Sequence, residues 1–146
     1  MLRWLRCVEQ YSLKDFHTID ADDPFFDGNL ILKSIKLRRE NNLDFVKPST
    51  YSSNGAASVG YSIKSSYLKK IIKNTDDSLD SEMINKFIES GQNHTSTIIE
   101  EDPILEYQVR LTLDYQEDFW LLASISRILG PIPEREQIIK LFEDNP

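Results

Sequence analysis

The chain has 146 residues and a mass of 17.0 kDa, a length that favours a single domain, residues 1–146, with its own hydrophobic core. Its net charge of -7 argues against nonspecific binding to nucleic acid or to a membrane surface. The single cysteine, Cys7, excludes an intrachain disulfide and a cysteine zinc cluster. Apolar runs are too short for a membrane span, and residues 1–16 lack a signal-peptide core, so we expect a cytoplasmic protein.

Segments with helical spacing alternate with short apolar runs along the chain. Asp27 and Ser65 are placed to cap helices, and Gly91 and Gly130 to end them. In chain order, we expect helix 2–11, strand 16–19, helix 28–41, strand 43–46, strand 58–63, helix 65–74, helix 79–91, strand 95–100, strand 107–113, helix 114–130 and helix 134–144.

This alternation predicts an α/β fold with a mixed, mostly parallel sheet and helices on both faces. In such sheets, ligands bind beyond the carboxyl ends of the strands. Two acidic segments are expected at such positions: residues 20–23 after the first strand, and Asp114 after strand 107–113. These carboxylates are therefore the candidate site.

Each carboxylate has a structural explanation beside a functional one. Asp114 lies three residues before Glu117, the spacing of a capping box, and residues 20–23 fit a solvated turn. Alternatively, Mg²⁺ takes oxygen ligands, typically one or two carboxylates together with water and phosphate oxygens. One aspartate from each strand end, Asp22 and Asp114, would be enough. Both interpretations stay open at this point.

Other motifs offer little chemistry. The chain has no dinucleotide-binding glycine motif, no phosphate-binding Walker loop and no serine nucleophile elbow. His17 and His94 have no partner at a recognisable spacing and are expected to be structural. Glu82 lies near a helix start, where the helix dipole favours it, and Arg110 is placed for a salt bridge to a nearby carboxylate.

Three segments resemble motifs of the cytidylyltransferases that activate acidic sugars. Residues 20–46, DADDPFFDGNLILKSIKLRRENNLDFV, resemble a motif that usually reads Gly-Asp-x-Pro-hydrophobic before a helix and a strand. Residues 110–125, RLTLDYQEDFWLLASI, resemble the later motif, which commonly reads Arg-hydrophobic-Thr-hydrophobic-Asp-Thr-x-x-Asp-hydrophobic. Residues 79–88 are similar to the glutamate-containing helix of the spore-coat polysaccharide branch. The likeness spans nearly the whole chain.

The resemblance implies a nucleotide-diphospho-sugar transferase-like fold. It also implies an enzyme that joins CMP, taken from CTP, to an acidic sugar such as a sialic acid or Kdo and releases pyrophosphate. The product would serve surface polysaccharide biosynthesis. It implies that Asp22 and Asp114 are catalytic and bind Mg²⁺. It also suggests Arg110 and Glu82 as substrate-binding residues. The implied partners are CTP and an acidic sugar, with no nucleic acid and no membrane.

The chain departs from the family pattern in three ways. Ala21 stands where the family usually has glycine, and Tyr115 replaces the usual threonine. Residues 1–16 supply no Gly- and Arg-rich nucleotide-binding loop, so we expect the chain to correspond to the C-terminal two-thirds of a cytidylyltransferase domain. Loss of the family's first strand would expose a sheet edge, which makes a homo-oligomer plausible.

Two other functions compete with this one. Without the nucleotide-binding loop, the chain could be a non-catalytic truncated paralogue or an assembly subunit that keeps the fold. It could also be a metal-dependent glycosyltransferase, because Asp20 and Asp22 satisfy the Asp-x-Asp pattern that binds the metal ion of a nucleotide sugar.

Overall fold

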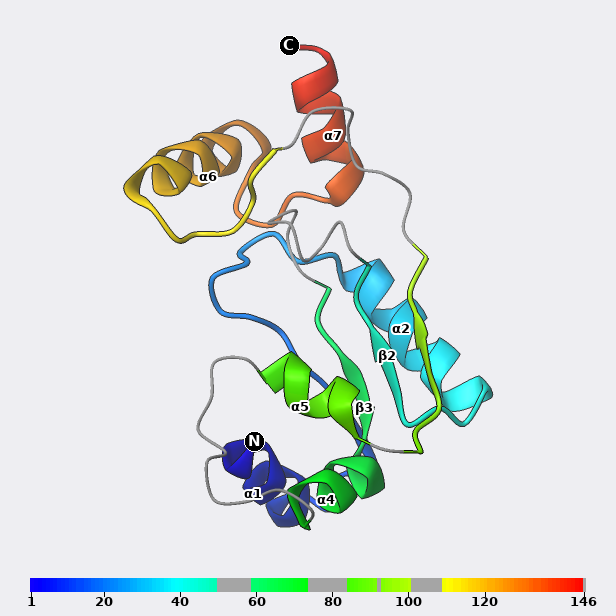
Figure 1. Ribbon diagram of the computed structural model, residues 1–146. Coiled ribbons are helices and arrows are strands. Elements are labelled where there is room, and N and C mark those ends of the chain that lie inside the picture. Colours follow the sequence, from blue (N-terminus) through cyan, green and yellow to red (C-terminus); the bar gives the residue numbers. More distant parts are fainter. Residues whose placement is uncertain (50–58, 74–83, 92, 101–108, 146) are drawn as a thin grey trace.

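The computed structural model describes residues 1–49, 59–73, 84–91, 93–100 and 109–145 (Figure 1). No helix within these ranges is both long enough and apolar enough to cross a membrane. In chain order the elements are α1 (Leu2–Gln10), β1 (Asp15–His17), α2 (Gly28–Glu40), β2 (Phe45–Lys47), β3 (Ser62–Lys64), α4 (Ser65–Lys73), α5 (Ile84–Ser90), β4 (Ser96–Ile98), α6 (Gln116–Leu129) and α7 (Arg135–Glu143).

The described strands form one mixed sheet in the order β1-β3-β2-β4. Strand β3 is antiparallel to both of its neighbours, and only the β2–β4 pair is parallel. The expected α/β class is confirmed, but the prediction of a mostly parallel sheet is wrong. Three strands do run in one direction, but β3 lies between β1 and β2 and reverses both of those pairings.

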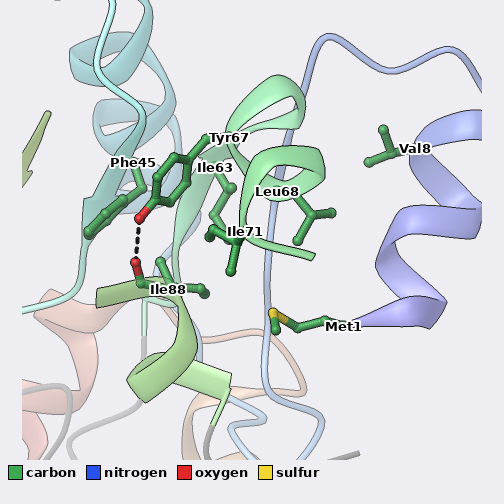
Figure 2. Close-up of a cluster of buried hydrophobic side chains, with 8 residues drawn as sticks. All are labelled: Met1, Val8, Phe45, Ile63, Tyr67, Leu68, Ile71 and Ile88. Carbon is green, nitrogen blue, oxygen red and sulfur yellow. Dashed lines mark hydrogen bonds between the residues drawn. The ribbon is translucent and has the colours of Figure 1, made fainter. Parts of the chain in front are cut away.

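Successive residues of a strand point to opposite sides of the sheet, and helices cover both of these faces. On one face, Phe45 and Ile63 are buried against Tyr67 of α4 and Ile88 of α5 (Figure 2). The Tyr67 hydroxyl donates a hydrogen bond of 2.6 Å to the backbone oxygen of Ile88. On the other face, Ser34 of α2 donates to Ser62 of β3 at 2.8 Å.

Helix α2 begins as expected, because the Asp27 carboxylate accepts hydrogen bonds from the backbone N–H groups of Asn29 and Leu30, at 2.8 and 3.0 Å. Near its other end, the buried Arg38 binds Asp15 of β1 at 2.6 Å, and Arg39 binds the same carboxylate at 2.7 Å. These two arginines fasten α2 to the sheet edge.

His17 joins β1 to its neighbours. Its Nε2 lies against the backbone oxygen of Val59, which can only accept, so Nε2 carries the proton and Nδ1 is the acceptor. The Ser62 hydroxyl therefore donates to Nδ1, over 2.8 Å. Burial lowers the pKa of His17, which favours this neutral form. The expected structural role of His17 fits these contacts.

A second hydrophobic cluster holds α6 and α7 together beyond the sheet. It contains Phe25, Leu111, Leu122, Ile125 and Ile138. Phe25 belongs to the loop after β1, which rises from the sheet towards α6 and α7 in Figure 1.

Two local predictions were wrong. Residues 109–113, the described part of the expected strand 107–113, pair in no strand; Leu111 instead packs into the α6–α7 cluster. Ser65 is the first residue of α4, and its buried hydroxyl has no hydrogen-bond partner, so it does not act as the expected cap.

Candidate functional site

The acidic turn after β1 and the segment before α6 lie against each other. The backbone N–H of Leu113 donates to the backbone oxygen of Asp22 at 2.7 Å. The Thr112 hydroxyl donates to the Asp23 carboxylate, also at 2.7 Å, although 89 positions separate these two residues. These contacts bring the backbones at Asp22 and Asp114, the two predicted metal ligands, to one place beyond the end of β1.

Within the turn, neighbouring aspartates have different surroundings. Asp23 is 4% exposed and turned towards Thr112, whereas Asp22 is exposed. The backbone N–H of Asp23 donates to the backbone oxygen of Asp20 at 3.2 Å, which closes the turn. Partial removal of the Asp20 carboxyl from water, and then repulsion from Asp23 and Asp22, raise the pKa of Asp20. A cation at this turn would relieve that repulsion.

The start of α6 differs from the expected capping box. The helix begins at Gln116, so Tyr115 occupies the cap position, and the predicted box of Asp114 with Glu117 is wrong by one residue. Asp118 is the acid that satisfies the helix start. Its carboxylate accepts hydrogen bonds from the backbone N–H groups of Asp114 and Tyr115, at 3.0 and 2.9 Å.

Arg110 connects the acids of this segment. Its side chain donates to Asp118 at 3.0 Å and to Asp114, and its guanidinium lies 5.2 Å from the centre of the Tyr115 ring. Burial opposes ionisation of Asp118, but the backbone hydrogen bonds and Arg110 outweigh burial and lower the pKa of Asp118. Arg110 thus forms the salt bridges that its position suggested.

Asp118 matches the second aspartate of the later family motif, but sequence reasoning gave it no role. The available signal was its place three residues after Tyr115, because an acid at that spacing can reach back to the cap backbone. Glu82, the other predicted substrate-binding residue, lies outside the described residues.

The donor set can be compared with the needs of Mg²⁺. In the part of the chain that the structure describes, no group of three or more carboxylate, histidine or cysteine side chains is arranged to hold a metal. Asp22 and Asp114 are both exposed, and Mg²⁺ commonly takes only one or two carboxylates, with water and phosphate oxygens as the other ligands. Two exposed carboxylates are within that number, and the Arg110 guanidinium already binds the carboxylate of Asp114.

A second polar cluster, also missed by sequence reasoning, lies at the same end of the sheet. The Tyr61 hydroxyl donates to Glu89 of α5 at 2.8 Å, and Lys47 at the end of β2 donates to the other carboxylate oxygen at 3.2 Å. Thr18 ties Tyr61 to the end of β1, because its backbone N–H donates to the Tyr61 backbone oxygen at 2.9 Å. We call Lys47, Tyr61 and Glu89 the lysine cluster.

Comparison of the sequence with protein-family models and with curated proteins finds no match. Comparison of the fold finds a solved structure of a cytidylyltransferase from Leptospira borgpetersenii serovar Hardjo-bovis (strain JB197), with a TM-score of 0.81 and 19% sequence identity. The likeness covers 99% of this chain and 62% of that one. The chain is therefore similar in fold to a cytidylyltransferase, and it spans 62% of that protein's length.

Proposed function

We propose that this chain is the metal-binding part of a cytidylyltransferase that joins CMP to an acidic sugar. A hydroxyl oxygen of the sugar would form a bond to the α-phosphorus of CTP as the bond from that phosphorus to the bridging oxygen breaks. Pyrophosphate leaves, and the hydroxyl proton passes to solvent. The observation that carries the proposal is the contact of residues 22–23 with residues 112–113, in a fold similar to that of a cytidylyltransferase.

In this proposal, Asp22 and Asp114 would hold Mg²⁺ from the two sides of that contact. The ion, when bound, would neutralise phosphate charge and help to align the reacting groups. The neighbouring side chains position Asp114. Asp118 accepts a hydrogen bond from the backbone N–H of Asp114, and Arg110 binds the Asp114 carboxylate, so both restrict the position of that ligand.

One observation favours a second candidate, a non-catalytic subunit that keeps the fold. Three of the acids at this place already have protein partners: Asp23 binds Thr112, and Arg110 binds Asp114 and Asp118. Such contacts could serve only to attach α6 and α7 to the sheet. Asp22 distinguishes the two candidates, because its exposed side chain matters for metal binding and not for that attachment.

The test measures pyrophosphate release from CTP and Mg²⁺ with N-acetylneuraminic acid or Kdo as acceptor. It uses the full natural protein and compares the wild type with the Asp22→Asn variant. Asp27→Asn is the matched control, because it removes the same charge nearby and asparagine caps helices as well as aspartate does. Loss of a metal ligand is expected to lower kcat by about 100-fold or more, as for other electrostatic contributions to catalysis.

Two results would contradict the proposal. One is a wild-type protein that releases no pyrophosphate with either acceptor, which would favour the non-catalytic subunit. The other is an Asp22→Asn variant as active as Asp27→Asn, which would remove the metal assignment. Transfer of a sugar from a nucleotide sugar, without pyrophosphate release, would instead indicate a glycosyltransferase.

A further inference from the structure

We propose that the lysine cluster binds the acceptor, with Lys47 on its carboxylate and Glu89 on its hydroxyl groups. This inference rests on the proposed function, because it assigns the second substrate to a place beside the acidic turn. The cluster is a distinct group of side chains. Among the described contacts, none of its three residues forms a hydrogen bond or ion pair with Asp22, Asp114 or Arg110.

The sheet register places the cluster beside the acidic turn. Val46 pairs with Ser62 in the antiparallel β2–β3 ladder, so the next residues outward, Lys47 and Tyr61, come opposite each other at its end. Their side chains share the face of Phe45 and Ile63, which is the face that α5 covers. Glu89 of α5 therefore reaches both of them.

The distance to the acidic turn is short along the chain. Thr18, which is bonded to Tyr61 through both its backbone N–H and its hydroxyl, is two residues before Asp20. The pKa of Tyr61 is raised first by burial, then by the hydrogen bond and charge of Glu89, and last by the charge of Asp20. Tyr61 thus stays protonated and can only hold Glu89 in place as a hydrogen-bond donor.

The charges of the cluster suit a hydroxylated acid. Lys47 has three N–H donors, and the contacts of the described residues use one of them, on Glu89, which leaves donors for a ligand carboxylate. Arg110, by contrast, is already bound to two carboxylates. The side chains of Lys47 and Glu89 are 32% and 40% exposed, so a ligand can reach both. Glu89 has lone pairs left to accept hydrogen bonds from ligand hydroxyls.

A purely structural role is the competing explanation, in which Lys47 and Glu89 only attach α5 to the sheet. Half-exposed ion pairs contribute little to stability, so that role predicts a small change in melting temperature and no change in ligand binding. Binding to a charged ligand group is worth more, about 1.5–3 kcal/mol for a charge-assisted hydrogen bond, or roughly 10- to 150-fold in affinity.

The experiment measures binding without turnover. N-acetylneuraminic acid, Kdo and their methyl esters are titrated into the full protein, followed by calorimetry and by the backbone amide resonances of residues 47, 61 and 89. Lys47→Met is expected to weaken binding of the acids by roughly 10- to 150-fold and to leave the uncharged esters unchanged. Glu89→Gln is expected to weaken binding of the acids and of the esters alike. Lys36→Met, in the exposed Lys36–Glu40 pair of α2, is the matched control and is expected to bind as the wild type does.

The outcomes separate the two proposals. Acid binding that depends on Lys47, in a protein that releases no pyrophosphate, would uphold the cluster and overturn the proposed function. Pyrophosphate release by a protein whose resonances at residues 47, 61 and 89 do not respond to the acids would uphold the proposed function and overturn the cluster. The inference also fails if neither acid binds, or if Lys47→Met weakens the acid and its ester equally.

Discussion

Replacing Gly60 by alanine should destabilise the fold where the end of β1 meets Tyr61. Gly60 has a φ of 69°, a left-handed conformation that costs an L-residue about 1–2 kcal/mol. A Cβ at this position would also lie 1.9 Å from the backbone oxygen of Thr18. Relief of that overlap requires Thr18 to move, which breaks its two hydrogen bonds with Tyr61, each worth about 0.5–1.5 kcal/mol. The total loss is about 2–5 kcal/mol.

Urea denaturation and thermal unfolding both measure this loss. At about 3 °C per kcal/mol for a protein of this size, the melting temperature of Gly60→Ala should fall by roughly 6–15 °C. Gly28→Ala is the matched control, because no atom lies within 4 Å of its added Cβ and alanine is the better helix former at the first residue of α2. A Gly60→Ala protein that melts within 2 °C of Gly28→Ala (a margin of about 0.7 kcal/mol) would refute the reasoning.

Two further predictions concern other contacts of the sheet. Because the folded state lowers the pKa of His17, the unfolded chain binds the proton more readily, and stability should fall as pH drops below about 6.5. His17→Gln should lose that part of the pH dependence in urea titrations at pH 5 to 8, and an unchanged slope would contradict it. Burial raises the pKa of Tyr67 to about 12, so its hydroxyl is a donor. Tyr67→Phe should lower the free energy of unfolding by about 1–2 kcal/mol, whereas the exposed Tyr11→Phe should not; equal stability of the two variants would exclude the Tyr67–Ile88 bond.

Local signals predicted the helices well. The cap at Asp27 and the stop at Gly130, where φ is 99°, each depend on residues within one turn of the helix end. The start of α6 was wrong by one residue because Asp114 and Asp118 are both acids at plausible capping distances. Only the backbone conformation of Tyr115 decides between them.

Strand partners could not be predicted in the same way. The alternation of Val109, Leu111 and Leu113 indicates extended backbone, but it does not show whether that backbone joins a sheet or lies against a loop. Similarly, no local pattern shows whether β3 runs with or against β2. The lysine cluster depends on that register and on contacts between residues 28 and 42 positions apart, so no local pattern could reveal it.

The loop after β1 is anchored at two distant points: Thr18 is bonded to the sheet, and Phe25 is buried with α6 and α7. Its acids therefore lie between an attachment to the sheet and an attachment to the α6–α7 cluster. A change in the packing of the α6–α7 cluster would change the spacing between Asp22 and the lysine cluster. Substitutions at the apolar contacts of Phe25 would consequently change the positions of these acids.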